Sequence, residues 1–245
     1  MILLPYLSMK LSIIIPLYNE EKLVLTVLDR LLAITYPPSV KEFEIVIVDD
    51  CSRDASYDNV SKYIQDKPFI HLHRHEVNQG KGAAVRTGIS KSTGDVILIQ
   101  DADLELHPQD IPKLIEAMDV LKVEFVNGSR YLPGVIRPIS SYRRYIFNKL
   151  FTYITSLLIN VRLTDMACGY KLFTRSLYEK IKLNENRFGF EAELLIKALR
   201  LKRNNVTEVP VNYFPRNEGE GKKLKSSDGF KIFWTIFKYG VLRMK

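Results

Sequence analysis

Three acidic side chains alternate in the stretch "QDADLEL" (100–106), at positions Asp101, Asp103 and Glu105. They directly follow the aliphatic run 96–99, which is typical of a buried strand. Like charges that are brought together repel unless a cation or a polar ligand compensates them. The stretch therefore predicts a site that needs a positively charged or polar partner.

Two more acid-rich segments follow apolar runs, "PLYNEE" (16–21) and "VDDCSRD" (48–54). One explanation is that such residues only cap the next helix, for which the best-placed side chains are those of Asn19, Asp54 and Asp110. Capping explains each segment alone, but three acidic clusters at successive strand ends indicate one shared crevice.

Four continuous runs rich in Ile and Val predict strands at 11–16, 43–50, 95–103 and 123–130. Segments with helical spacing lie between and after them, at 20–34, 56–65, 82–90 and 108–121. This order predicts an α/β fold with a Rossmann-like, mostly parallel sheet and helices on both faces. Ligands bind such sheets outside the carboxyl ends of the strands, which is where the acidic segments lie.

The stretch "NQGKGAAVRTG" (78–88) places Gly80 and Gly82 on either side of Lys81, just before a predicted helix. In the crevice, a lysine at a helix N-terminus would favour a phosphate group, although by itself the stretch is also explained as a flexible loop. No G-x-G-x-x-G follows the first strand and no G-x-x-x-x-G-K-[ST] occurs, which argues against a dinucleotide site and a P-loop.

The composition sets broad limits on the protein. Its 245 residues, 46% of them hydrophobic, suffice for a sizeable core. Cys51 and Cys168 form neither a disulfide framework nor a metal-ligand pattern, so we expect a reducing compartment. The formal net charge of +8 predicts attraction to polyanions, whether nucleic acid, an anionic membrane or phosphorylated substrates.

The N-terminal "MILLPYLSMK" lacks a basic leading segment and an evident cleavage site, so we do not expect a secretory signal, and Met9 is an alternative start. No uninterrupted apolar run reaches the roughly 18 residues that a spanning helix requires. Any membrane contact is therefore expected to be peripheral.

No acidic residue occurs from Phe125 through Thr164, where basic and apolar residues recur at helical spacing. We expect an amphipathic basic helical segment at 136–162 and a second amphipathic basic helix in the tail, at 229–245. These helices either cover the sheet or each other, or they present apolar and basic side chains to an anionic membrane. The two roles are compatible if they use different faces.

Several segments together resemble a known family. They are "SIIIPLYNEE", "VDDCSRD", "NQGKGAAVRTG", "GDVILIQDADLEL", "VNGSRY", "TDMACGYKLFTR" and "VPVNYFPRNEGEGKK". Their order and spacing resemble family 2 inverting glycosyltransferases of the GT-A fold, most closely the branch of dolichol-phosphate mannose synthases and bacterial polyprenyl-phosphate glycosyltransferases. The resemblance covers roughly residues 10–235. It implies a single catalytic domain at 10–217, followed at 218–245 by a lid loop and the basic helix.

The resemblance also implies roles for individual residues on the donor side. The nucleotide of the sugar donor is expected to contact the first two strand ends and the residues beside them, namely Pro16, Tyr18, Glu20, Asp49, Asp50, Lys81 and Asp101. Asp101, Asp103 and Glu105 are expected to hold Mg²⁺ or Mn²⁺ against the donor diphosphate. Both cations prefer oxygen ligands, and alternate residues share one side of the chain if the extended geometry persists. Glu105 departs from the Gln that many relatives have.

On the acceptor side, the resemblance points to Asp165 as a carboxylate base for a hydroxyl acceptor. A lipid phosphate is already ionised and needs no base, so Asp165 would then only position groups, and a helix cap is its alternative role. Arg216, with Lys222 or Lys223 on a Gly-rich segment that could close as a lid, matches the phosphate contacts of the lipid-phosphate branch.

The expected function is transfer of a hexose from a nucleotide sugar of the GDP-mannose or UDP-glucose type to a polyprenyl phosphate, at the cytoplasmic face of a membrane. A saccharide acceptor is the alternative. Nucleic acid is not expected as a partner, because it would leave the acidic crevice without a use. Glu191 and Glu193 lie on a predicted helix that begins near Phe190, where a structural role is favoured and a supporting contact to the site is the alternative.

Overall fold

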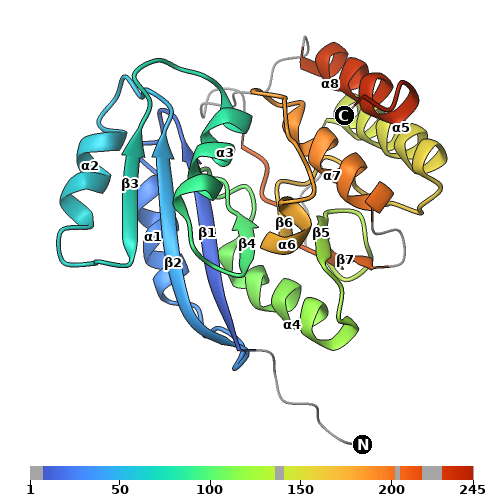
Figure 1. Ribbon diagram of the computed structural model, residues 1–245. Coiled ribbons are helices and arrows are strands. Elements are labelled where there is room, and N and C mark those ends of the chain that lie inside the picture. The colour runs from blue at the N-terminus through green and yellow to red at the C-terminus, as the bar shows by residue number, and fades with distance from the viewer. Residues whose placement is uncertain (1–7, 136–140, 202–204, 217–227, 245) are drawn as a thin grey trace, which may run out of the picture.

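Seven strands form one sheet in the computed structural model, which describes residues 8–135, 141–201, 205–216 and 228–244 (Figure 1). The strands are β1 (Met9–Leu17), β2 (Val40–Asp49), β3 (Ile70–Arg74), β4 (Val96–Ile99), β5 (Phe125–Ser129), β6 (Lys171–Thr174) and β7 (Val206–Pro210). Their order across the sheet is β3-β2-β1-β4-β6-β5-β7. Only β6 runs antiparallel to its neighbours, β4 and β5, so the sheet is mostly parallel as predicted.

Helices cover both faces of this sheet, as expected (Figure 1). They are α1 (Val24–Leu32), α2 (Ser56–Tyr63), α3 (Lys81–Lys91), α4 (Ile111–Leu121), α5 (Tyr142–Ile159), α6 (Arg175–Tyr178), α7 (Phe190–Leu201) and α8 (Asp228–Ile236). A 3-10 turn at Pro108–Asp110 leads into α4, and a π-helical turn at Phe237–Val241 follows α8. Helices α1, α2 and α4 pack on one face of the sheet, and α3 and α7 pack on the other.

The central strand β1 shows why the apolar runs are continuous. Leu11, Ile13 and Ile15 pack into the core beneath α1 and α4, whereas Ile14 between them packs into the core beneath α3 and α7. All four side chains are fully buried. Because successive side chains of a strand point to opposite faces, a strand covered on both sides is apolar at most positions, and the buried Ser12 of β1 is satisfied by a hydrogen bond to Glu44.

Three strands were not among the predicted ones. β3, β6 and β7 are only four or five residues long, and β3 carries polar side chains because it lies at the edge of the sheet. The predicted strand 95–103 is also too long, since β4 ends at Ile99 and the chain then turns. Leu104 within that turn has a φ of 57°, which the sequence pattern does not indicate.

Helices α5 and α8 lie side by side at the outer side of α7 (Figure 1). Phe151 of α5 and Phe233 of α8 contact each other, with ring centroids 6.4 Å apart. Both helices also expose large apolar side chains, namely Tyr142, Ile146, Phe147, Leu150, Tyr153 and Leu157 of α5 and Phe230, Phe233 and Trp234 of α8. Mutual packing of the basic helices is thus confirmed. In the part of the chain that the structure describes, no helix combines the length and apolarity needed to cross a membrane.

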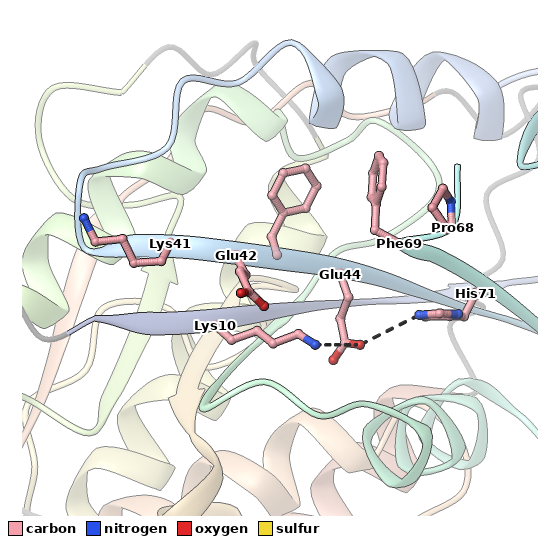
Figure 2. A pocket seen from close by; sticks show the side chains of 8 residues that line it. Lys10, Lys41, Glu42, Glu44, Pro68, Phe69 and His71 are labelled. Atoms are coloured by element: carbon pink, nitrogen blue, oxygen red, sulfur yellow. Dashed lines mark ion pairs between the residues drawn. The ribbon is translucent and has the colours of Figure 1, made fainter. Parts of the chain in front are cut away.

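A buried carboxylate ties together the amino ends of the first strands (Figure 2). Glu44 of β2 accepts hydrogen bonds from the Ser12 hydroxyl at 2.7 Å and from the Thr93 N–H at 2.6 Å. Its other oxygen lies 3.7 Å from Lys10 Nζ and 3.9 Å from His71 Nε2. Burial raises the pKa of Glu44, but these hydrogen bonds and the Lys10 charge outweigh burial, so the pKa is lowered. The shallow pocket around it is at the opposite end of the sheet from the acidic strand ends.

Glu44→Gln keeps the shape of the side chain but removes its charge, so we expect the free energy of unfolding at pH 7 to fall by about 1–3 kcal/mol in urea denaturation. The pKa of Glu44 is lowered by folding, so this stabilisation is present above the ordinary glutamate pKa of about 4.3 and is lost as the pH falls through the folded value. The exposed neighbour Glu42 supplies the control, since Glu42→Gln should cost less than about 0.5 kcal/mol. A wild-type advantage that persists unchanged in acid would contradict the prediction.

Candidate active site

The carboxyl ends of three neighbouring strands meet at one edge of the sheet. β1 pairs with β2 on one side and with β4 on the other, so the residues after these strands are adjacent. The Asp50 N–H donates to Leu17 O at 2.8 Å, and the Gln100 N–H donates to Ile14 O at 3.0 Å. The predicted convergence of the acidic segments is therefore confirmed.

Lys81 lies between two carboxylates at this edge. Its Nζ is 2.6 Å from Asp101 Oδ1 and 2.6 Å from Glu191 Oε1, and all three side chains are largely buried. Burial by itself lowers the pKa of Lys81, but the two carboxylates raise it more, so the ammonium stays charged. Glu191 at the start of α7 thus makes the supporting contact that was the alternative to a purely structural role.

Glu193, in the first turn of α7, is fully buried, and its carboxylate binds the backbone of the segment before this helix. Its carboxylate accepts hydrogen bonds from the Asn184 N–H at 2.9 Å and from the Glu185 N–H at 2.8 Å, and it pairs with Lys197 at 2.6 Å. This residue has the structural role that the sequence favoured.

Arg216 compensates a second pair of acids. Its guanidinium lies 2.9 Å from Glu20 Oε2 and 3.2 Å from Asp103 Oδ2. Glu20 follows β1 and Asp103 follows β4, so the arginine bridges two strand ends. Burial, and after it the charges of Asp101 and Glu105, raise the pKa of Asp103 to about 7 although Arg216 lowers it. The acids therefore favour more positive charge than the described residues supply.

Glu105 does not share a face with Asp101 and Asp103, because the extended geometry ends at Ile99 and the chain turns at Leu104. The Glu105 N–H donates to Asp103 Oδ1 at 3.1 Å, which closes the turn. Its carboxylate instead accepts from the Tyr213 hydroxyl and from the Arg216 N–H, both at 3.0 Å.

Asp49 and Asp50 organise the loops beside the crevice. Asp50 accepts from the N–H groups of Gln79 and Gly80, at 2.8 and 2.7 Å, and from His75 Nδ1 at 2.8 Å. Gly80 has a φ of 100°, and a Cβ there would lie 2.5 Å from the carbonyl oxygen of Asn186. Only glycine fits that position, so Asp50 and Gly80 together fix where Lys81 begins α3.

Asp49 is fully buried, and its carboxylate lies 3.2 Å from Arg74 Nε. Pro16 and Tyr18, the remaining predicted donor contacts, are half-buried at the end of β1.

Of the possible helix caps, Asp54 accepts from the Ser56 N–H at 3.0 Å at the start of α2, and Asp110 accepts from the Asn212 N–H at 2.7 Å, in a distant segment.

Asp165 forms a second centre near the acids. Arg130 holds it with two charged hydrogen bonds, from Nε at 2.6 Å and from Nη2 at 2.9 Å, and Asn148 of α5 donates at 3.1 Å. Burial raises the pKa of Asp165, but the Arg130 guanidinium outweighs it and lowers the pKa. No helix begins at Asp165, so the helix-cap alternative is wrong. The Arg130 guanidinium lies 5.0 Å from the ring of Tyr213, which connects the two centres.

A buried polar network lies beneath Asp165. Lys171 is fully buried on β6 and donates to Asn127 Oδ1 at 2.6 Å. Asn127 in turn donates to the Asp165 carbonyl oxygen at 2.8 Å and to Glu208 at 2.9 Å. Burial lowers the pKa of Lys171, as desolvation does for a cationic group. These groups hold the backbone of Asp165 in place.

Asp101 and Asp103 are the residues that could hold a divalent cation. Within the described ranges, no group of three or more His, Cys, Asp or Glu side chains is arranged as a set of metal ligands. The donor chemistry nevertheless fits Mg²⁺ or Mn²⁺, which usually take one or two carboxylates together with phosphate oxygens and waters. Gly169 lets the Asp101 carboxylate lie close to the backbone, because any side chain at this position would place a Cβ only 2.5 Å from Asp101 Oδ2. Lys222 and Lys223, predicted to bind phosphate, lie outside the described residues, as do 136–140 of the basic segment.

Residues 12–182 match the sequence family described as glycosyl transferase family 2. The chain is a family 2 glycosyltransferase. It is 32% identical, over 96% of its own length and 74% of the other protein, to a dolichyl-phosphate beta-glucosyltransferase of Trichomonas vaginalis. It is also 32% identical to the dolichol-phosphate mannosyltransferase of Pyrococcus furiosus, over 94% of this chain and 63% of that one.

The fold of this glycosyltransferase is the GT-A fold, as predicted. A crystal structure of glucosyl-3-phosphoglycerate synthase from Mycobacterium tuberculosis, in complex with Mn²⁺, UDP and glucosyl-3-phosphoglycerate, superimposes with a TM-score of 0.69. The match covers 95% of this chain and 80% of the other, with 17% sequence identity.

Sequence reasoning missed several residues that contact the site of the glycosyltransferase, above all Arg130, Tyr213 and Gly169. Each lies in a segment that carries the family resemblance, "VNGSRY", "VPVNYFPR" and "TDMACGYK" respectively. The signal was therefore present, but which side chains meet across the sheet depends on contacts between segments far apart in sequence.

Gly169→Ala would place a methyl group against the Asp101 carboxylate. Because the closest contact is 2.5 Å, Asp101 must shift, and we expect kcat/KM for sugar transfer to fall on the order of 10²-fold while the protein remains folded. Steady-state kinetics and the thermal unfolding midpoint check this. Gly229→Ala is the matched control, since its added Cβ meets nothing within 4 Å and its backbone does not have the positive φ that disfavours alanine. Equal activity of both variants would show that the position of Asp101 is unimportant.

Proposed function

We propose that this glycosyltransferase moves a hexose from a nucleotide sugar to a polyprenyl phosphate, such as dolichyl phosphate, at the cytoplasmic face of a membrane. The choice of acceptor rests on the burial, the hydrogen bonds and the pKa of Asp165. Its carboxylate is fully buried, held by two charged hydrogen bonds from Arg130, and has a lowered pKa. Such a carboxylate is a poor proton acceptor, which favours an acceptor that is already ionised.

On the donor side, Asp101 and Asp103 are proposed to hold Mg²⁺ or Mn²⁺, and Lys81 and Arg216 are proposed to contact the diphosphate. When bound, the cation would offset the negative charge that grows on the departing nucleoside diphosphate. Two features support this assignment: the raised pKa of Asp103, and the two basic side chains already seated between the acids. Pro16, Tyr18 and Glu20 at the end of β1 are proposed to contact the nucleotide.

On the acceptor side, an oxygen of the lipid phosphate is proposed to attack the anomeric carbon of the hexose. The new carbon–oxygen bond forms as the bond to the donor diphosphate breaks, and the nucleoside diphosphate leaves with that electron pair. The acceptor oxygen carries no proton to remove, so Asp165 has a positioning role through Arg130. Lys222 and Lys223 are proposed as further phosphate contacts.

The exposed side chains of α5 and α8 support a membrane surface. Tyr153 is 68% exposed and Phe230 is 76% exposed, and the basic residues Arg143, Lys231 and Arg243 are exposed on or beside the same helices. Aromatic and aliphatic side chains combined with Lys and Arg fit the headgroup region of an anionic bilayer. The named relatives from Trichomonas vaginalis and Pyrococcus furiosus are dolichyl- and dolichol-phosphate enzymes, which agrees with this proposal.

The function is tested with a panel of nucleotide sugars, each incubated with Mn²⁺ or Mg²⁺ and polyprenyl phosphate, and the lipid phase is analysed by mass spectrometry. We expect one donor to yield a polyprenyl-phosphate hexose. Asp103→Asn should lower this rate on the order of 10²–10³-fold, because it removes a charge from the proposed cation site. The matched control is Asp119→Asn on α4. Sugar transfer to a saccharide but not to the lipid would support the other acceptor class.

The membrane proposal is tested with the fluorescence of Trp234, which is the single tryptophan of the chain and is 54% exposed on α8. We expect its emission to shift to the blue, and iodide quenching to decrease, when anionic phospholipid vesicles are added, with a smaller effect of neutral vesicles. Phe230→Ser should weaken vesicle binding measured by sedimentation, whereas Val120→Ser, at an exposed position on α4, should not. Unchanged emission together with no sedimentation would remove the membrane surface from the proposal.

A further inference from the structure

We propose that Glu105 is a positioning residue that clasps the segment 213–216 and so places Arg216 at the acidic crevice, rather than a ligand of the cation. The role of these contacts in sugar transfer rests on the proposed function, but the contacts themselves are present in the protein without any ligand. We call the contacts between 104–106 and 213–216 the Glu105 clasp.

Four hydrogen-bonding features make up the clasp. The Glu105 carboxylate accepts from the Tyr213 hydroxyl and from the Arg216 N–H, each at 3.0 Å. The Glu105 carbonyl oxygen accepts from the Phe214 N–H at 2.9 Å, and Leu106 forms an antiparallel bridge with Tyr213. The main chain and side chain of Glu105 thus hold Tyr213, Phe214 and Arg216, which lie about 110 residues away in sequence.

The local backbone explains why Glu105 faces this segment and not the crevice. Leu104 has a φ of 57°, so the alternation of side chains along the strand is broken between Asp103 and Glu105. The bond from the Glu105 N–H to Asp103 Oδ1, at 3.1 Å, closes that turn. Asp103 can therefore face Arg216 from one side while Glu105 faces the backbone of Arg216 from the other.

A carboxylate fits the clasp better than an amide. Both oxygens of Glu105 act as acceptors, and the Arg216 N–H can only donate. A glutamine would turn its NH₂ group toward one of these two donors, and only the Tyr213 hydroxyl could reverse its role. Burial, with the charge of Glu105, raises the pKa of Tyr213, which keeps the phenol protonated as a donor.

The clasp acts on Arg216 because the guanidinium extends from the held backbone to Glu20 and Asp103. If Asp103 held a cation, the backbone of Arg216 would still be fixed by Glu105, and the guanidinium would stay at the crevice, where it would contact the donor diphosphate. A Glu105 that served as a cation ligand would have to release Tyr213 and the Arg216 N–H.

The test measures amide hydrogen exchange in the metal-free protein for wild type, Glu105→Gln and Tyr213→Phe. We expect exchange of the Arg216 amide to be about tenfold faster or more in Glu105→Gln, because a neutral amide oxygen is a weaker acceptor than the carboxylate, and also faster in Tyr213→Phe, because the second side-chain contact of the clasp is lost. The double variant should be no faster than Glu105→Gln alone, because both changes open one clasp. Glu116→Gln, on the exposed side of α4, and Tyr63→Phe, which removes a distant hydrogen bond to Asp29, are the matched controls.

Mn²⁺ titration by calorimetry separates the clasp from a ligand role. If Glu105 is a clasp, the Mn²⁺ dissociation constant of Tyr213→Phe stays within about twofold of wild type, and that of Glu105→Gln rises by no more than about threefold, because a nearby negative charge is lost but no ligand is. If Glu105→Gln alone weakens Mn²⁺ binding tenfold or more and the Arg216 amide is unchanged, the clasp is wrong. Hydrogen exchange needs no sugar transfer, so a failed donor panel with an intact exchange result would overturn the proposed function and leave the clasp standing.

Discussion

Repulsion among carboxylates at one edge of the sheet is the constraint on which the site depends. Glu20, Asp101 and Asp103 follow two paired parallel strands, and the register of those strands forces them together. Buried charges are tolerated only when partners compensate them, and here the partners are Lys81 and Arg216. Much of the structure around the crevice serves to position these two basic side chains.

The two basic side chains are held at the crevice in different ways. Lys81 begins α3, where Asp50 fixes the preceding backbone and Glu191 of α7 holds the ammonium from the far side. Arg216 comes from the C-terminal part of the chain and is held through its own backbone by Glu105. Lys81 is therefore fixed at its side chain, whereas Arg216 is fixed at its backbone, and its guanidinium contacts Glu20 and Asp103. This difference suits a lysine that stays and an arginine that exchanges partners.

The sequence predicted those features that follow from local pattern. Continuous apolar runs indicated the doubly covered strands, and acids at their ends indicated the crevice, because parallel strands align their carboxyl ends. The orientation of Glu105 could not be predicted, since it depends on a left-handed φ at Leu104, a residue type that rarely adopts one. The burial of Asp165 under Arg130 was equally hidden, because it needs β5 and the segment before β6 to meet. Strand β6, with four residues, is too short to show a pattern.

Strand β6 is antiparallel to its neighbours, so its amino end lies on the same side of the sheet as the carboxyl ends of β4 and β5. The connection that leads into β6 starts at the end of α5, and Asp165 lies six residues after Ile159. Asn148 of α5 even donates directly to Asp165. The helix that exposes aromatic side chains outward is thus also a wall of the proposed acceptor site. With that helix on a membrane, as proposed, a lipid acceptor would find the enzyme by lateral diffusion in a plane, and its headgroup would reach the crevice without its tail crossing water.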